Sequence, residues 1–135
     1  ARAQPPESDR TSTPRLAPRS RILVVDDETS VRGVIRQVLE MGGHHVQDAE
    51  SAEAAVEQLR EGFEPELVLL DRSMPGWPIR RAISELRAHA ADAPIVFFTG
   101  QSVPDDEAEL VDGVLHKPMS IEELHYAIAR WLRRR

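Results

Sequence analysis

Residues 67–76 read Leu-Val-Leu-Leu-Asp-Arg-Ser-Met-Pro-Gly, and this stretch decides the fold. Four consecutive apolar residues before a turn signal are typical of a strand that is buried on both faces of a parallel sheet. Asp71 stands directly at the end of this run, ahead of Pro75 and Gly76. We therefore expect a carboxylate at the carboxyl edge of the sheet, where α/β proteins bind their ligands.

Three further apolar runs, at residues 22–25, 95–98 and 114–115, also lead into polar side chains. The side chains that follow them include Asp26, Asp27, Thr99 and Lys117. Because the carboxyl ends of parallel strands share one edge, these groups should converge with Asp71 on a single pocket.

Helical patterns alternate with these runs. Apolar spacing predicts helices at residues 30–41, at residues 52–60 and from residue 79 to a point before Pro94. A short helix is expected within residues 105–111, and a capping box at residues 120–123 begins a last helix. A weak strand is expected at residues 45–49. Five strand–helix repeats predict an α/β protein with a flavodoxin-like, doubly wound five-stranded parallel sheet of order 2-1-3-4-5 and a shortened fourth helix.

Composition limits the classes of function. The chain has 135 residues and no cysteine, so we expect one domain at residues 21–135 in a reducing compartment, the cytoplasm. The net charge of −6 argues against general binding of nucleic acid or of a membrane surface. Residues 1–20 are rich in proline and poor in apolar residues, which predicts a disordered or extended linker.

Four motifs together carry a resemblance to a known family. They are VVDDE at residues 24–28, LLDRSMPG at 69–76, FFTG at 97–100 and LHKP at 115–118. In this order they resemble the receiver domain of two-component response regulators and hybrid sensor histidine kinases, from Arg21 to about Leu132. The resemblance implies that Asp71 accepts a phosphoryl group from the phosphohistidine of a sensor kinase or a histidine phosphotransfer protein.

The resemblance also assigns the other site residues. Lys117 and Thr99 would contact the phosphoryl group, and the Lys117–Pro118 bond would be cis. Asp27, Asp71 and the backbone carbonyl of Ser73 would hold Mg²⁺, with Asp26 beside the ion and in contact with it mainly through water. Ser73 and Gln101 occupy positions that in the family tune the rate of phosphoryl loss.

Physical chemistry supports these roles. Clustered carboxylates repel one another and need a cation, and Mg²⁺ prefers oxygen ligands. A carboxylate can act as the nucleophile toward phosphorus, and phosphoryl transfer then depends on positioning and on cations at the phosphoryl oxygens. Taken singly, Asp26 and Asp27 could cap the next helix, and Lys117 could be a solvated lysine. The joint occurrence of all these residues favours the phosphoryl-transfer roles over the simpler readings.

Three features depart from the family pattern. Pro78-Ile79 replaces a polar-glycine pair before the third helix, and Val114 replaces an aromatic residue that moves inward on phosphorylation. The segment between Thr99 and Lys117 is also shorter than the family usually has. These departures concern the output surface and leave the acidic pocket intact.

The sequence leaves several alternatives open. The proline-rich start and the absence of an initiator Met favour the C-terminal receiver of a hybrid kinase, with a stand-alone regulator nearly as good. No independent enzyme is expected beyond self-phosphorylation and self-dephosphorylation. A haloacid-dehalogenase-type phosphatase would need a second Asp where Ser73 stands, and a Rossmann domain would need a glycine fingerprint. A degenerate receiver that only binds partners is the remaining alternative.

Overall fold

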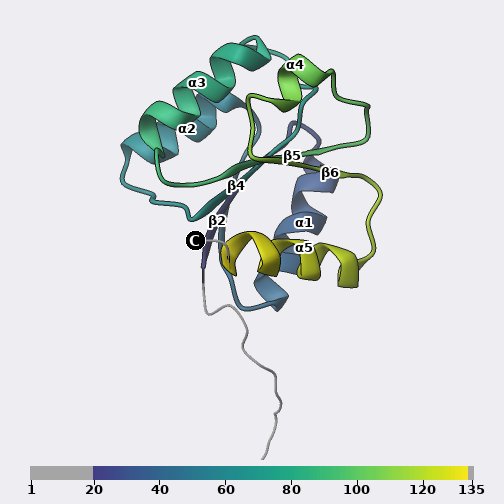
Figure 1. The fold of residues 1–135 in the computed structure, drawn as a ribbon. Coiled ribbons are helices and arrows are strands. Elements are labelled where there is room, and N and C mark those ends of the chain that lie inside the picture. The colour runs from purple at the N-terminus through teal and green to yellow at the C-terminus, as the bar shows by residue number, and fades with distance from the viewer. Residues whose placement is uncertain (1–19, 134–135) are drawn as a thin grey trace, which may run out of the picture.

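The computed structural model describes residues 20–133, and the predicted linker at residues 1–20 lies outside this range apart from Ser20. Five strands and five helices alternate along the described chain (Figure 1). The strands are β2 (Arg21–Val25), β3 (His45–Ala49), β4 (Leu67–Leu70), β5 (Ile95–Thr99) and β6 (Gly113–His116). The helices are α1 (Thr29–Met41), α2 (Ala52–Arg60), α3 (Ile79–His89), α4 (Asp105–Ala108) and α5 (Ile121–Arg133).

The five strands form one parallel sheet in the order β3-β2-β4-β5-β6. Counted along the described chain, this is the predicted order 2-1-3-4-5, which is confirmed. The order of the strands changes direction at β2, which lies between β3 and β4 in the sheet. Ligands of open α/β sheets bind at such a switch point.

Helices cover both faces of the sheet (Figure 1). One face packs against α2 and α3 and includes Leu23, Val68 and Phe97 among its fully buried side chains. The other face packs against α1 and α5, with Leu69 and Val96 at its centre. Since β4 is buried along its whole length, its sequence is uniformly apolar and does not alternate.

Local signals set several helix boundaries. The Ser51 hydroxyl accepts a hydrogen bond of 3.0 Å from the Ala54 N–H and caps α2. Ser120 and Glu123 form the reciprocal capping box of α5, with bonds of 2.8 and 3.0 Å. Gly43, with φ of 93°, follows the end of α1 in a conformation that favours glycine.

The fourth helix is short, as predicted. α4 spans only Asp105–Ala108, because the backbone bonds after Ala108 tighten into turns before Val111 enters the core. Arg80 of α3 pairs with Asp106 at 2.8 Å and helps to hold this short helix.

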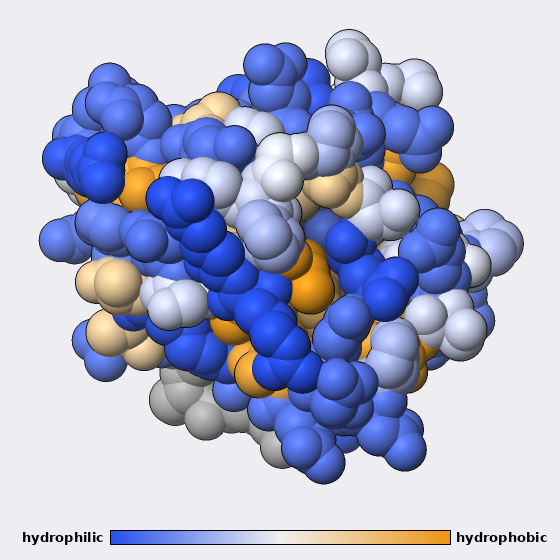
Figure 2. Space-filling view, turned by 90° about the horizontal axis from the view of Figure 1, so that it is seen from above, coloured by the Kyte–Doolittle hydropathy of each residue, from blue (hydrophilic) through white to orange (hydrophobic). Residues whose placement is uncertain are grey.

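The surface seen from above in Figure 2 is mainly hydrophilic, with small apolar areas between charged side chains. In the described part of the chain, no helix has the length and apolar character to cross a membrane.

Candidate functional site: an acidic pocket at the carboxyl edge of the sheet

The sheet ladder itself places the acidic residues. The Asp71 N–H donates to the Val25 carbonyl at 2.9 Å, and the Asp26 N–H donates to the Ala49 carbonyl at 3.1 Å. These bonds continue the strand pairing one residue beyond the strand ends. They hold Asp26 and Asp71 at neighbouring positions on the carboxyl edge, as parallel register requires.

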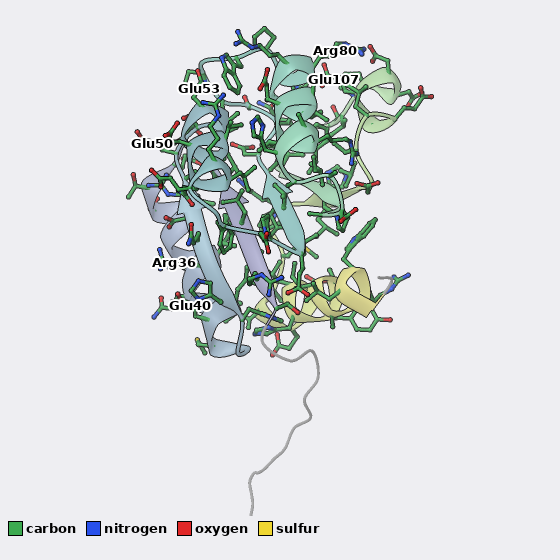
Figure 3. The ribbon with its side chains drawn as sticks, turned by 90° about the vertical axis from the view of Figure 1, so that its left-hand side faces the viewer. Arg36, Glu40, Glu50, Glu53, Arg80 and Glu107 are labelled. Carbon is green, nitrogen blue, oxygen red and sulfur yellow. The ribbon has the colours of Figure 1, made fainter. Side chains whose placement is uncertain are left out.

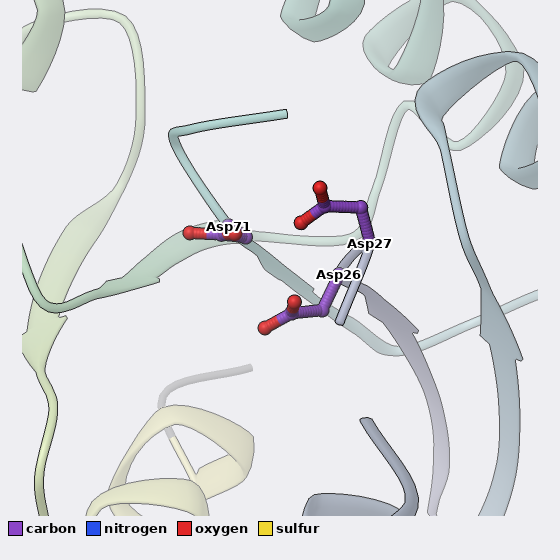
Figure 4. A group of neighbouring side chains, drawn as sticks. All are labelled: Asp26, Asp27 and Asp71. Carbon is purple, nitrogen blue, oxygen red and sulfur yellow. The ribbon is translucent and has the colours of Figure 1, made fainter. Parts of the chain in front are cut away.

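Three carboxylates meet at this edge (Figure 4). Each of Asp26, Asp27 and Asp71 offers an oxygen that lies within 4.8 Å of the oxygens of the other two. Asp26 and Asp71 are buried, whereas Asp27 is exposed. The cluster is therefore shielded from solvent at Asp26 and Asp71 and open to solvent at Asp27. Its carboxylate oxygens fit a hard divalent cation.

Asp26 does not cap the following helix. Its Oδ1 accepts a bond of 2.9 Å from the Glu28 N–H, and Glu28 is the N-cap residue of α1 without a side-chain cap. Its Oδ2 accepts a bond of 2.8 Å from the Lys117 Nζ. The simpler reading of the acidic pair as a helix cap is therefore wrong for Asp26.

Asp71 is buried and has no ion pair of its own among the described contacts, in contrast to Asp26, which pairs with Lys117. Burial raises the pKa of its carboxyl above the usual value, and the negative charge of Asp26 raises it further. The positive charge of Lys117 and the Ser73 N–H, 3.4 Å from Oδ1, lower that pKa. A buried carboxylate whose pKa is raised by burial and by a second carboxylate is the arrangement that a bound metal ion would stabilise.

Thr99 and Lys117 come to the same edge from the neighbouring strands. Thr99 is fully buried, and its Oγ1 accepts a bond of 3.1 Å from the Gln101 N–H. The Lys117 N–H donates to the Thr99 carbonyl at 2.9 Å, and the Lys117–Pro118 bond is cis, as expected from the sequence.

The histidines do not join this site. Within residues 20–133, the aspartate group is the one set of three or more potential metal ligands that lie close together. His44 is half-buried at the end of α1, where burial and then the charge of His125 lower its pKa. All five histidines are exposed or half-buried: His44, His45, His89, His116 and His125.

Two arginines near the pocket carry contacts that the sequence did not reveal. Arg32 of α1 donates to the Asp26 carbonyl at 2.7 Å. Arg72, next to Asp71, donates to Glu107 at 2.6 Å. Arg32 lies in the first turns of α1. No local sequence pattern links Arg72 to Glu107 of α4, because the two residues lie 35 positions apart.

The family comparison agrees with this geometry. A sequence model described as "Response regulator receiver domain" matches residues 22–129. The chain belongs to this family. The receiver domain is the phosphoacceptor module of two-component systems, so the haloacid-dehalogenase and Rossmann alternatives are not favoured.

The curated relatives differ in how much of their length this chain covers. The phosphate regulon transcriptional regulatory protein PhoB of Klebsiella pneumoniae is 36% identical over 120 residues, which cover 84% of this chain and 52% of PhoB. The two-component response regulator ORR41 of Oryza sativa subsp. japonica is 33% identical over 118 residues, which cover 82% of this chain and 93% of ORR41. The chain thus spans about half of PhoB and nearly all of ORR41.

Solved structures show the same fold. The response regulator TrrA of Thermotoga maritima, in complex with Mg²⁺-BeF, matches with a TM-score of 0.73 and 31% identity, covering 83% of this chain and 98% of TrrA. The chemotaxis protein CheY4 of Vibrio cholerae matches with a TM-score of 0.76 and 23% identity, covering 84% and 98%, which supports the fold alone.

Proposed function

We propose that this receiver domain accepts a phosphoryl group on Asp71 from a phosphohistidine, with Mg²⁺ bound beside it. The observation that carries the proposal is the convergence of three carboxylates within 4.8 Å beside the Lys117 ammonium. A single carboxylate at a strand end would be unremarkable, but this set provides a nucleophile, cation ligands and a cation together.

Each side chain has a distinct part in the proposed transfer. An oxygen of Asp71 attacks phosphorus, and the bond from phosphorus to the histidine nitrogen breaks, with its electron pair staying on the imidazole. Lys117 then stabilises negative charge on the phosphoryl oxygens, and the Thr99 hydroxyl donates a hydrogen bond to one of them. The Asp71 carboxylate becomes an acyl phosphate, which water can hydrolyse.

The proposed metal ligands are Asp27, Asp71 and the carbonyl of Ser73, with Asp26 close by through water. When bound, Mg²⁺ would neutralise the carboxylates and the incoming phosphoryl charge. The Mg²⁺-BeF complex of TrrA supports a metal requirement of this kind in a relative that is 31% identical.

The phosphodonor is proposed to be a sensor histidine kinase or a histidine phosphotransfer protein. A groove of about 370 Å³ between α1 and α5 lies beside Lys117 and is lined largely by apolar side chains. Val34 and Ile121 on its rim are 60% and 52% exposed. An apolar groove beside Lys117, which contacts Asp26 of the acidic cluster, favours docking of a helix that carries the phosphohistidine.

The test uses two phosphodonors, with intact-mass measurement as the readout. With Mg²⁺ and acetyl phosphate, wild type should gain one phosphoryl group, and Asp71→Asn or omission of Mg²⁺ should abolish the gain. Labelling of Asp71→Asn equal to wild type would disprove the assignment of Asp71. Val34→Asp should impair transfer from a phosphorylated histidine phosphotransfer domain while leaving transfer from acetyl phosphate unchanged.

The larger protein context is also a proposal. The receiver forms the C-terminal part of a hybrid kinase or acts as a single-domain regulator, with residues 1–20 as a linker. Because the chain covers only 52% of PhoB, the output activity of that protein is not carried over.

A further inference from the structure

Arg72 joins two segments that flank the acidic pocket. Its Nε donates to Glu107 Oε1 at 2.6 Å, and its Nη1 donates to Gln101 Oε1 at 3.2 Å. Its side chain is 24% exposed and that of Glu107 is 18% exposed, so the ion pair is partly shielded from water. Figure 3 shows Glu107 near Arg80, where α4 meets α3.

Gln101 is consequently held at two points. Its backbone N–H donates to the Thr99 hydroxyl at 3.1 Å, and its side-chain oxygen accepts from Arg72. Gln101 thus lies between the hydroxyl of Thr99 and the residue that follows Asp71. Gln101 is exposed, and fixing its side chain costs rotamer entropy. The hydrogen bond from the Arg72 guanidinium offsets this cost.

Whether the side-chain oxygen of Gln101 is engaged matters for hydrolysis of phosphorylated Asp71, a reaction that rests on the proposed function. In hydrolysis, a water oxygen bonds to phosphorus and the bond from phosphorus to the Asp71 carboxylate breaks. The carboxylate keeps the electron pair, and the water proton leaves with inorganic phosphate or passes to solvent. The attacking water must donate a hydrogen bond to an acceptor that orients it.

Gln101 has only one side-chain acceptor, Oε1, and its nitrogen can only donate. A free glutamine carbonyl can orient an attacking water in phosphoryl transfer. In this structure a charge-assisted bond from Arg72 engages that oxygen, and the ion pair with Glu107 anchors the guanidinium.

We propose that Arg72 is a positioning residue that keeps the Gln101 carbonyl oxygen engaged and thereby slows hydrolysis of phosphorylated Asp71. The short α4 supplies the anchor, Glu107, for this contact. Arg72 itself need not touch the phosphoryl group or the water.

The central experiment measures the dephosphorylation rate of the full chain after phosphorylation with acetyl phosphate. Arg72→Ala should hydrolyse about three- to tenfold faster, the effect of freeing one hydrogen-bond acceptor. Gln101→Met has a similar length but no carbonyl, and in this background Arg72→Ala should have no effect. Arg72→Lys keeps a donor and should retain most of the slow rate.

Arg80→Ala is the matched control. It breaks a different ion pair to α4, the 2.8 Å contact of Arg80 in α3 with Asp106, and leaves the bond from Arg72 to Gln101 in place. It should leave hydrolysis at the wild-type rate. The proposal is overturned if Arg72→Ala hydrolyses like wild type, if its acceleration persists in Gln101→Met, or if Arg80→Ala reproduces it.

A second readout separates this inference from the proposed function. If wild type gains no phosphoryl group, the proposed function fails, and the contact is then tested by NMR of the unphosphorylated protein. The side-chain amide resonances of Gln101 should shift in Arg72→Ala and stay in place in Arg80→Ala. Unchanged resonances in Arg72→Ala would overturn the inference.

Discussion

Lys117 Nζ donates a hydrogen bond of 2.8 Å to Asp26 Oδ2, across 91 positions of the chain. The Asp26 side chain is only 3% exposed, so its charge depends on this ammonium and on the Glu28 N–H. In the structure the lysine therefore neutralises Asp26. A phosphoryl group on Asp71 would have to share or take over this cation.

Lys117→Met should destabilise the metal-free domain by about 1–3 kcal/mol, because it leaves the buried Asp26 carboxylate with one backbone donor. The measurement is urea unfolding in the presence of EDTA. Calorimetry should still detect Mg²⁺ binding, whereas the phosphorylated state formed with acetyl phosphate should be less stable than in wild type.

The control for this prediction is Asp26→Asn in the Lys117→Met background. It removes the unpaired charge and should recover a large part of the lost stability. If the single Lys117→Met variant unfolds at the wild-type urea concentration, the ion pair does not contribute as described.

Asp71→Asn should stabilise the metal-free domain at neutral pH and raise its Tm by several degrees. Burial and the neighbouring Asp26 raise the pKa of Asp71 in the folded state above the ordinary value of 3.8. The folded state thus binds this proton more tightly than the unfolded state, and stability falls as pH rises from 3.8 through the raised pKa.

The Tm difference between Asp71→Asn and wild type should therefore shrink as pH is lowered toward 3.8. Adding Mg²⁺ should raise the Tm of wild type more than that of Asp71→Asn, because the ion binds only the folded cluster. An Asp71→Asn variant that is less stable than wild type in EDTA at pH 7 would contradict the electrostatic account.

Gly113 and Gly33 offer a matched pair of glycine substitutions. A β-carbon at Gly113 would overlap with the Trp131 ring of α5, so Gly113→Ala should cost about 1–3 kcal/mol in unfolding free energy. Gly33 is exposed in the middle of α1 with no atom near its β-carbon position. Gly33→Ala should add about 0.5–1 kcal/mol. Equal stabilities of the two variants would refute this account of the α5 contact.

Phosphorylation should alter the β6 side of the domain less than is usual for receivers. Val114 packs beside the core where the family has a larger aromatic ring. The helix α4 has only four residues with which to form a second packing arrangement. A two-state switch needs two discrete arrangements, so we expect local ordering of the loop after Thr99.

Amide chemical-shift mapping with beryllofluoride tests this prediction. Shifts should be confined to residues 26–28, 71–76 and 99–103. Shifts across Val114, Leu115 and α5 as large as those at Asp71 would show that the domain switches through β6 in spite of Val114.

The alternation of strands and helices, and with it the sheet order, could be predicted from the sequence. The central strands are short apolar runs, and Ser51 and Ser120 cap α2 and α5. These are local properties, set by residues a few positions apart. The convergence of Asp26, Asp71 and Thr99 followed from the same information, because parallel strands share their carboxyl edge.

Only the tertiary structure decided which charged groups pair at that edge. Lys117 contacts Asp26, Arg72 reaches Glu107, and Trp131 packs over Gly113, and no periodicity encodes these contacts. Long side chains have many rotamers, and their partners are set by the spacing of elements that lie far apart in the sequence. The residue types at the site were thus determined by the sequence, and their pairing by the packing of helices and loops around the sheet.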